Sequence, residues 1–354
     1  MEDLRLDSHK LMFHIGRLQR WLKHGDVFPI YLEVGVSGGC NHRCVFCAFD
    51  FLKYKPSFIE KNCLKKFIRQ AADAGVKAVL FSGEGEPLLH KDFAEILGFT
   101  RKKGIDTALV TNGVLMRKEI SAKILKYLCW VKVSLDAGLE KTYSFVHGTN
   151  GHDFHTVLSN LREAVKIRNK NDYHCTIGVQ SLLLPQNIQE MGILAKTVKK
   201  IGADYLAIKP FSPHAASKNK IHFNLKSAAL VSLEKKLTSY SDDSFRLILR
   251  KQAVAKLKEK KPYRNCLGLS FAAHLAVSGE VYPCNAFVGV KKYSFGNIGS
   301  RDFKEIWMGP RRKKIMALLQ SKFNPDSCRK SCRLDEINRY LWDLKHPGRH
   351  VNFI

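Results

Sequence analysis

This chain has few acidic side chains, no long apolar run and, in its first ten residues, no apolar segment typical of a signal peptide. Its 32 Asp and Glu stand against 59 Lys and Arg, which leaves a formal net charge of +27. A hydrophobic content of 45% over 354 residues excludes a disordered polypeptide and is enough for a large core. No run reaches the roughly eighteen apolar residues of a membrane helix, and the N-terminal MEDLRLDSHK lacks the apolar core of a signal peptide. We therefore expect a soluble, cytoplasmic protein with no membrane partner.

Ten cysteines are the most informative residues present. Without a secretion signal, a disulfide framework is not expected. Cys63, Cys129 and Cys175 stand singly among apolar neighbours, which is typical of small buried side chains. The other seven form two groups and predict metal binding: Cys40, Cys44 and Cys47, then Cys266, Cys284, Cys328 and Cys332.

Apolar runs alternate with amphipathic segments through the first two thirds of the chain. Six strand–helix units in this order predict a parallel sheet. We expect an α/β fold, a partial (β/α)6 TIM-like barrel, with functional residues at the carboxyl ends of its strands. An open doubly wound sheet is the alternative. The predicted strands cover 31–36, 77–82, 106–110, 131–135, 174–184 and 204–209, and the predicted helices cover 58–75, 91–103, 117–128, 154–169 and 187–201.

The points where the alternation of strands and helices begins and ends divide the chain into four predicted segments. Residues 1–28 form a helical segment, with Leu11, Ile15, Leu18 and Leu22 at helical spacing. The barrel covers 29–210, a linker with helices covers 211–264, and a small cysteine-bearing module covers 265–354.

The first cysteine group lies in CNHRCVFC, directly after a predicted strand and a glycine turn. Three thiolates around a four-iron cluster leave one iron open to another ligand. A structural zinc site needs four ligands, so it would have to recruit His42 or a distant residue. The loop alone leaves both possibilities open.

This three-two spacing resembles the signature of the radical S-adenosylmethionine (radical SAM) superfamily. The resemblance implies a [4Fe-4S] cluster on Cys40, Cys44 and Cys47, with S-adenosylmethionine chelating the open iron. It implies reductive cleavage of that cofactor to a 5′-deoxyadenosyl radical, which abstracts hydrogen from the substrate. It also implies a reductase such as flavodoxin or ferredoxin as electron donor. Phe46 matches the family's aromatic residue near the adenine.

Motifs at later strand ends strengthen the resemblance. SGEGEPLL (82–89) is similar to the family's Gly-Gly-Glu-Pro motif, with Gly85 and Glu86 aligned. The resemblance assigns Glu86 to the ammonium of S-adenosylmethionine. Glu84 replaces the first glycine, and its role is left open.

The third and fourth strands end in VTNG (110–113) and VSLDAG (133–138). Ser134 and Asp136 match positions that face the cofactor's ribose or carboxylate, and Asn112 is a candidate wall of the same cavity. Plain turn chemistry is the alternative, above all for Asn112. Weaker candidates for lining the cofactor or substrate site are Gln180, Ser181 and Lys209.

The C-terminal cysteines fit one further metal site. Four thiols satisfy either tetrahedral zinc or a fully ligated iron–sulfur cluster, and spacing does not choose between them. The glycine-then-cysteine pattern SGEVYPC resembles the auxiliary-cluster modules called SPASM and, in a shorter form, twitch. That resemblance implies one auxiliary iron–sulfur cluster, most simply [4Fe-4S].

Together these features predict a radical SAM oxidoreductase. We expect it to oxidise a small polar substrate (a sugar, nucleotide sugar or aminocyclitol) and to pass an electron to the auxiliary cluster. The basic composition, including eight Lys and Arg within 311–333, predicts an anionic substrate. A peptide or protein maturase is the enzymatic alternative. A zinc-stabilised nucleic-acid-binding protein is the alternative from another class, although no nucleic-acid module is recognisable.

Overall fold

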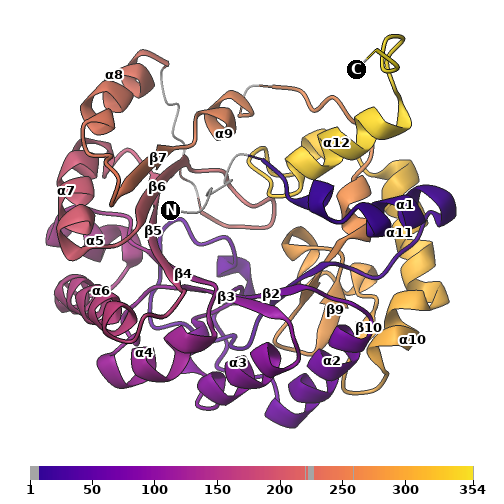
Figure 1. Cartoon of the computed structure of the whole chain (residues 1–354), viewed down its shortest axis with the longest axis horizontal. Coiled ribbons are helices and arrows are strands. Elements are labelled where there is room, and N and C mark those ends of the chain that lie inside the picture. Colours follow the sequence, from indigo (N-terminus) through magenta and orange to yellow (C-terminus); the bar gives the residue numbers. More distant parts are fainter. Residues whose placement is uncertain (1–7, 220, 222–226, 258, 354) are drawn as a thin grey trace.

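A single ten-stranded sheet in the order β10-β9-β8-β1-β2-β3-β4-β5-β6-β7 runs through the computed structural model (Figure 1). Residues 8–219, 221, 227–257 and 259–353 are described, with the side chains of 227–229 left aside. The strands are β1 (Tyr31–Val34), β2 (Ala78–Phe81), β3 (Asp106–Thr111), β4 (Trp130–Ser134), β5 (Thr176–Leu183), β6 (Tyr205–Pro210), β7 (Arg246–Leu249), β8 (Ala272–Leu275), β9 (Glu280–Tyr282) and β10 (Gly296–Asn297).

Helices cover the outside of the curved sheet, and short loops return each helix to the next parallel strand (Figure 1). Among the described residues, no helix has the length and apolar character needed to cross a membrane. The helices are α1 (Ile15–His24), α2 (Lys61–Asp73), α3 (Phe93–Lys102), α4 (Lys118–Ile124), α5 (Glu140–His147), α6 (His152–Lys170), α7 (Met191–Ile201), α8 (Ser227–Thr238), α9 (Lys251–Ala255), α10 (Phe303–Met308), α11 (Pro310–Lys322) and α12 (Asp335–Lys345).

Helix α2 illustrates how the sequence encodes these crossovers. The Glu60 carboxylate accepts hydrogen bonds from the backbone N–H groups of Asn62 and Cys63, which caps the first turn. Apolar residues three or four apart (Leu64, Phe67, Ile68 and Ala71) are all buried against the sheet. The chain turns immediately afterwards at Gly75, whose φ is 82°.

The predicted partial barrel with a C-terminal cysteine module is confirmed, and all six predicted strands are present. Between residues 29 and 264, strand β7 and helix α5 were not predicted, and no individual helix was predicted in the C-terminal module. Strand β7 pairs in parallel with β6 and lies in the segment predicted as a helical linker, and α5 follows β4. The predicted segment boundaries stay predictions, and residues 1–7, 220, 222–226 and 258 within those segments lie outside the described residues.

The predicted apolar face of the N-terminal helix is partly wrong. Leu18 is buried, but Ile15 and Leu22 are 73% and 48% exposed. Trp21 supplies the other buried contact of α1 and packs on Phe271, with ring centroids 5.5 Å apart. The segment docks on the C-terminal module, so that module and not helical spacing alone decides which side is covered.

The C-terminal module is continuous with the barrel sheet. Strand β8 pairs in parallel with β1, and β9 and β10 extend the sheet in antiparallel fashion. The indole N–H of Trp307 donates to the carbonyl of Val27 at 2.7 Å, and the buried guanidinium of Arg312 makes two 2.9 Å hydrogen bonds to Asp26. The module therefore holds the segment that leads into β1.

Candidate active site

The loop after β1 carries Cys40, Cys44 and Cys47 and is held by the loop after β2. The backbone N–H of Glu86 donates to the carbonyl of Gly39 at 2.9 Å. A Cβ on Gly85 would lie 2.0 Å from that carbonyl oxygen and 2.7 Å from the one of Ser37. Glycine is therefore required at position 85, because the two backbones approach closely there.

Glu86 connects the ends of β2 and β3. Its buried carboxylate accepts from the hydroxyl of Thr111 (2.6 Å) and from the backbone N–H groups of Asn112 (2.8 Å) and Leu88 (3.1 Å). Burial raises the pKa of Glu86, and these three donors oppose that shift. Its two oxygens have lone pairs beyond those three donors, and Glu86 lines the cavity described below.

Glu84, whose role the sequence left open, faces the C-terminal module and does not line the cavity described below. Its carboxylate accepts from the backbone N–H of Val277 at 2.9 Å and lies 3.7 Å from Nε2 of His274. The other imidazole nitrogen of His274 lies 3.7 Å from Glu33. Burial alone would lower the pKa of His274, but the two carboxylates raise it to about 9. A protonated imidazole therefore joins β8 to the barrel.

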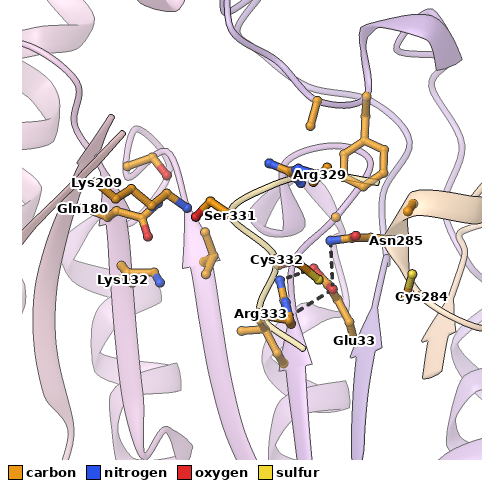
Figure 2. A pocket seen from close by; sticks show the side chains of 18 of the residues that line it. Glu33, Lys132, Gln180, Lys209, Cys284, Asn285, Arg329, Ser331, Cys332 and Arg333 are labelled. Carbon is orange, nitrogen blue, oxygen red and sulfur yellow. Dashed lines mark hydrogen bonds and ion pairs between the residues drawn. The ribbon is translucent and has the colours of Figure 1, made fainter. Parts of the chain in front are cut away.

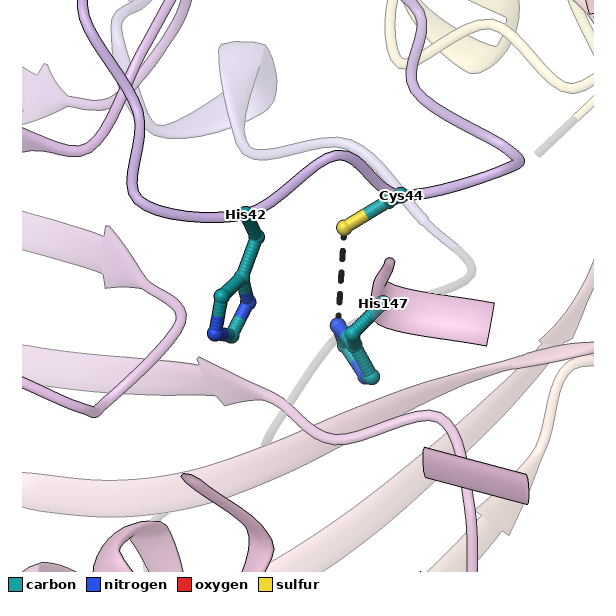
Figure 3. Close-up of side chains that lie close together, drawn as sticks. All are labelled: His42, Cys44 and His147. Atoms are coloured by element: carbon teal, nitrogen blue, oxygen red, sulfur yellow. Dashed lines mark hydrogen bonds between the residues drawn. The ribbon is translucent and has the colours of Figure 1, made fainter. Parts of the chain in front are cut away.

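His147, at the end of α5, contacts the cysteine loop directly (Figure 3). Its Nδ1 lies 3.5 Å from Sγ of Cys44, and its Nε2 accepts from the backbone N–H of Asp136 at 3.1 Å. Because Nε2 is the acceptor, Nδ1 carries the proton and donates to the sulfur. Burial lowers the pKa of His147 well below its ordinary value, so the imidazole is neutral. Sequence reasoning missed this residue because it missed α5.

His42 lies beside the same thiol (Figure 3). Ligand atoms of His42, Cys44 and His147 lie within 4.8 Å of one another. The Nε2 of His42 is 3.1 Å from the carboxylate of Asp153, which also accepts from Thr149. The carboxylate of Asp153 therefore fixes the ring of His42, as the backbone N–H of Asp136 fixes that of His147. Both imidazoles are held beside Cys44.

The remaining predicted cofactor residues divide into two groups. Phe46, Asn112 and Ser134 line the cavity, as do the weaker candidates Gln180 and Lys209. Asp136 and Ser181 are buried and are not among the lining residues. One oxygen of Asp136 accepts from the backbone N–H of Leu182 and the other has no hydrogen-bond partner, so burial raises the pKa of this carboxyl to about 7. The predicted contact of Asp136 with the cofactor stays a prediction.

The four C-terminal cysteines come from three places in the module. Cys266 precedes β8, Cys284 follows β9, and Cys328 and Cys332 lie between α11 and α12. Burial raises the pKa of Cys284 well above its ordinary value, and the other three thiols add to the shift, which shows how close together they lie. Asn338 donates to the sulfur of Cys266 at 3.3 Å. The fold thus gathers thiols that are up to 66 residues apart.

No three of the described cysteine sulfurs are as close together as a single zinc ion requires. Zn–S bonds of about 2.3 Å place the sulfurs of a tetrahedral site roughly 3.8 Å apart. Within the described part of the chain, no three cysteine sulfurs lie within 4.8 Å of one another. Three thiols in one loop, and four from separate segments of the C-terminal module, therefore suit the wider iron–sulfur cube, with one iron left open at the first site.

A cavity of about 540 Å³ is lined by cysteines of both sets. Figure 2 shows the part of its wall that carries Cys284 and Cys332. Cys40 and Cys44 line one part of it, and Cys284, Cys328 and Cys332 line another. Its walls come from the barrel strands and from the segment that carries Cys332 and Arg333. A molecule that fills this cavity would contact both cysteine sets.

Two family models match the chain. The radical SAM superfamily model matches residues 34–198, and the SPASM iron–sulfur cluster-binding domain matches residues 266–333. This chain is a radical SAM protein with a C-terminal SPASM domain. The radical SAM domain implies a [4Fe-4S] cluster and S-adenosylmethionine, and the SPASM domain implies auxiliary iron–sulfur binding. The shorter twitch form is not confirmed.

The radical SAM chain has several curated relatives. It is 23% identical over 305 residues to the tungsten-containing aldehyde ferredoxin oxidoreductase cofactor-modifying protein of Pyrococcus furiosus, covering 79% of this chain and 81% of the relative. It is 24% identical over 312 residues to the subtilosin biosynthesis protein AlbA of Bacillus subtilis, covering 86% of this chain and 65% of AlbA. The chain spans 46% of the length of a GTP 3′,8-cyclase of Aliarcobacter butzleri, at 36% identity over 41% of this chain.

Solved structures share the fold. Streptococcus suis SuiB bound to S-adenosylmethionine superposes with a TM-score of 0.67 at 20% identity, covering 92% of this chain and 78% of SuiB. The protein anSMEcpe with bound S-adenosylmethionine gives a TM-score of 0.59 at 19% identity, covering 90% of this chain and 95% of anSMEcpe. With the family shown, the alternative of a zinc-stabilised nucleic-acid-binding protein is set aside.

Proposed function

We propose that this radical SAM enzyme modifies a peptide or protein segment that enters the cavity between its two cysteine sets. The observation that carries the proposal is the shared cavity, lined by Cys40 and Cys44 and also by Cys284, Cys328 and Cys332. A substrate there has the radical-generating site on one side and an electron acceptor on the other. Four protein ligands at the second site favour electron transfer or fold stabilisation over direct substrate binding.

The chain's own residues have distinct tasks in this proposal. Cys40, Cys44 and Cys47 hold the first cluster. When bound, that cluster and S-adenosylmethionine supply the one-electron chemistry of the family. The remaining lone pairs of Glu86 would accept from the cofactor ammonium, and Phe46 would pack on its adenine. Asn112, Ser134 and Asp136 are the further proposed cofactor residues.

The relatives support a peptide substrate. AlbA is named for the biosynthesis of a bacteriocin, and SuiB has been solved with the precursor peptide SuiA. The sugar-type substrate expected from the sequence is therefore our second candidate. Five basic residues line the cavity and favour an anionic sugar: Lys132, Lys209, Arg250, Arg329 and Arg333. Oxidation by loss of hydrogen and an electron is possible for either substrate. A flavodoxin- or ferredoxin-type donor would reduce the first cluster in both cases.

The first test is formation of 5′-deoxyadenosine by the anaerobically reconstituted, chemically reduced protein with S-adenosylmethionine. We expect product from the wild type and from Cys63→Ala, whose isolated thiol belongs to neither set. Cys44→Ala should abolish it, because the first cluster loses a ligand. If zinc is bound and no product forms, the proposal is wrong.

Deuterium transfer then separates the two substrate classes. Deuterated peptides and deuterated sugars are supplied separately, and the label is measured in 5′-deoxyadenosine by mass spectrometry. Label from peptides alone supports the maturase. Label from sugars alone overturns it in favour of the second candidate.

A further inference from the structure

Two lysines face the cavity from neighbouring parts of the barrel wall. Lys132 lies on β4 and pairs with Gly178, and Lys209 lies on β6 and pairs with Leu182. Gly178, Gln180 and Leu182 alternate by two along β5, and paired residues of parallel strands share a face. Lys132, Gln180 and Lys209 therefore point to the same side, and all three line the cavity (Figure 2).

Among the described residues, neither ammonium group forms an ion pair, although the charge of Glu33 acts on Lys132 and that of Asp136 on Lys209. Within the described ranges, no carboxylate makes an ion pair with Lys132 or Lys209; Lys132 has only the Trp130 ring, 5.4 Å from its Nζ. By contrast, Arg333 makes a 3.2 Å ion pair with Glu33 in the same cavity. The two lysines thus differ from Arg333, whose charge a carboxylate of the same wall neutralises.

The carboxylates that line the cavity already accept hydrogen bonds from groups other than the two lysines. Glu33 accepts from Arg333 and Ser82, and Glu86 accepts from its three donors at the ends of β2 and β3. Burial, with Arg333 and Arg250 nearby, lowers the pKa of Lys132 to about 8. Burial and the charge of Lys132 lower the pKa of Lys209 well below its ordinary value. Burying two positively charged ammonium groups close together costs free energy unless an anion neutralises them.

We propose that Lys132, Gln180 and Lys209 form a subsite for an oxyanion of the substrate, either a carboxylate or a phosphate. Two ammonium groups and an amide provide several donors for one anionic group. This inference rests on the proposed function, because it specifies what the substrate must carry into the cavity. A peptide would bring an acidic side chain or its C-terminal carboxylate.

The subsite lies toward the auxiliary set of cysteines. The charges that act most on Lys132 belong to Arg333, Arg250 and Glu33, and those on Lys209 include Arg329, which follows Cys328. No charged group of the Cys40–Cys47 loop is among them. S-adenosylmethionine is expected to chelate the open iron held by that loop, so the anion proposed here is the substrate's own.

The test is binding of small anions to reconstituted holoenzyme with S-adenosylmethionine bound, measured by isothermal titration calorimetry at constant ionic strength. The probes are inorganic pyrophosphate, for a phosphate, and N-acetylglutamate amide, for a peptide carboxylate. We expect saturable binding of at least one probe, weakened about ten-fold or more in Lys132→Met and in Lys209→Met. Lys102→Met, an exposed lysine on α3, should bind as the wild type does. Lys209→Arg, which keeps the charge, should restore binding in part and controls for misfolding.

Each outcome is decisive for the subsite. Loss of probe binding with unchanged affinity for S-adenosylmethionine supports it, and the better probe identifies the oxyanion. No saturable binding to the wild type, or equal binding by all variants, overturns it. Displacement of the probe by S-adenosylmethionine, with both affinities reduced in the variants, assigns the lysines to the cofactor and also overturns it. Formation of 5′-deoxyadenosine is measured separately, so the subsite can fail while the proposed function stands.

Discussion

At the scale of single residues, His147 is the side chain that most directly affects the first cysteine loop. Its N–H donates to Cys44, and an N–H donor to a ligating sulfur stabilises the reduced, more negative cluster. We expect His147→Phe to lower the reduction potential of the first cluster by an amount on the order of tens of mV. A redox titration followed by electron paramagnetic resonance measures it. His155→Phe, on the exposed face of α6, is the control, and an unchanged potential in His147→Phe with full iron content would contradict the hydrogen bond.

Gly85 makes the second prediction at this scale. A Cβ there meets two backbone oxygens of the cysteine loop, which cannot rotate away as a side chain could. We expect Gly85→Ala to lower the free energy of unfolding by roughly 1–3 kcal/mol and to reduce iron loading at the first site. Urea denaturation and iron analysis measure the two effects. Gly16→Ala is the matched control: Gly16 lies in α1 with nothing within 4 Å, so stability should stay the same or rise by up to about 1 kcal/mol.

At the scale of elements, the hairpin of β8 and β9 and the segment between α11 and α12 together bring the cysteines of the proposed auxiliary site to one cavity. Cys284 lies at the end of that hairpin and lines the cavity with Cys328 and Cys332. We expect Cys284→Ala to remove one cluster's iron and leave part of the reductive cleavage of S-adenosylmethionine, because the first loop is untouched. Iron content per chain decides the matter, with Cys129→Ala as control. Full iron content in Cys284→Ala would show that the auxiliary site is assigned wrongly.

At the scale of the whole molecule, His274 carries a charge that joins the SPASM domain to the barrel. Its pKa of about 9 lies above the ordinary value of 6.5, since Glu33 and Glu84 stabilise the protonated form. This contribution to stability is therefore complete below pH 6.5 and is lost as the pH rises through 9. We expect His274→Gln to be less stable than the wild type by an amount on the order of 3 kcal/mol near pH 6, with the difference shrinking toward pH 10. Urea denaturation across that range measures it, and a difference that does not change with pH would show that His274 is uncharged.

Local pattern was enough for much of the fold and for the first cysteine site. Alternating apolar segments determined the six barrel strands, because periodicity is a property of adjacent residues. The spacing of Cys40, Cys44 and Cys47 is likewise local, since one loop holds all three. Strand-end motifs placed Glu86 and Asn112 at one edge, because parallel strands present their carboxyl ends together.

Tertiary structure decided what depends on distant segments. Strand β7 forms only because β6 offers a free edge, and Glu84 turns to Val277 because β8 lies beside β1. Lys132 lies two residues before Ser134 on β4, so both side chains lie on the same face and the alternation along the strand could have identified Lys132. That no described carboxylate forms an ion pair with it is visible only in the tertiary structure. His147 lies on a helix that local pattern did not predict. The sequence by itself determined the radical SAM barrel strands and the single loop that gathers Cys40, Cys44 and Cys47; packing alone decided which distant charges and thiols face the same space, because a pairing across the chain has no local periodicity.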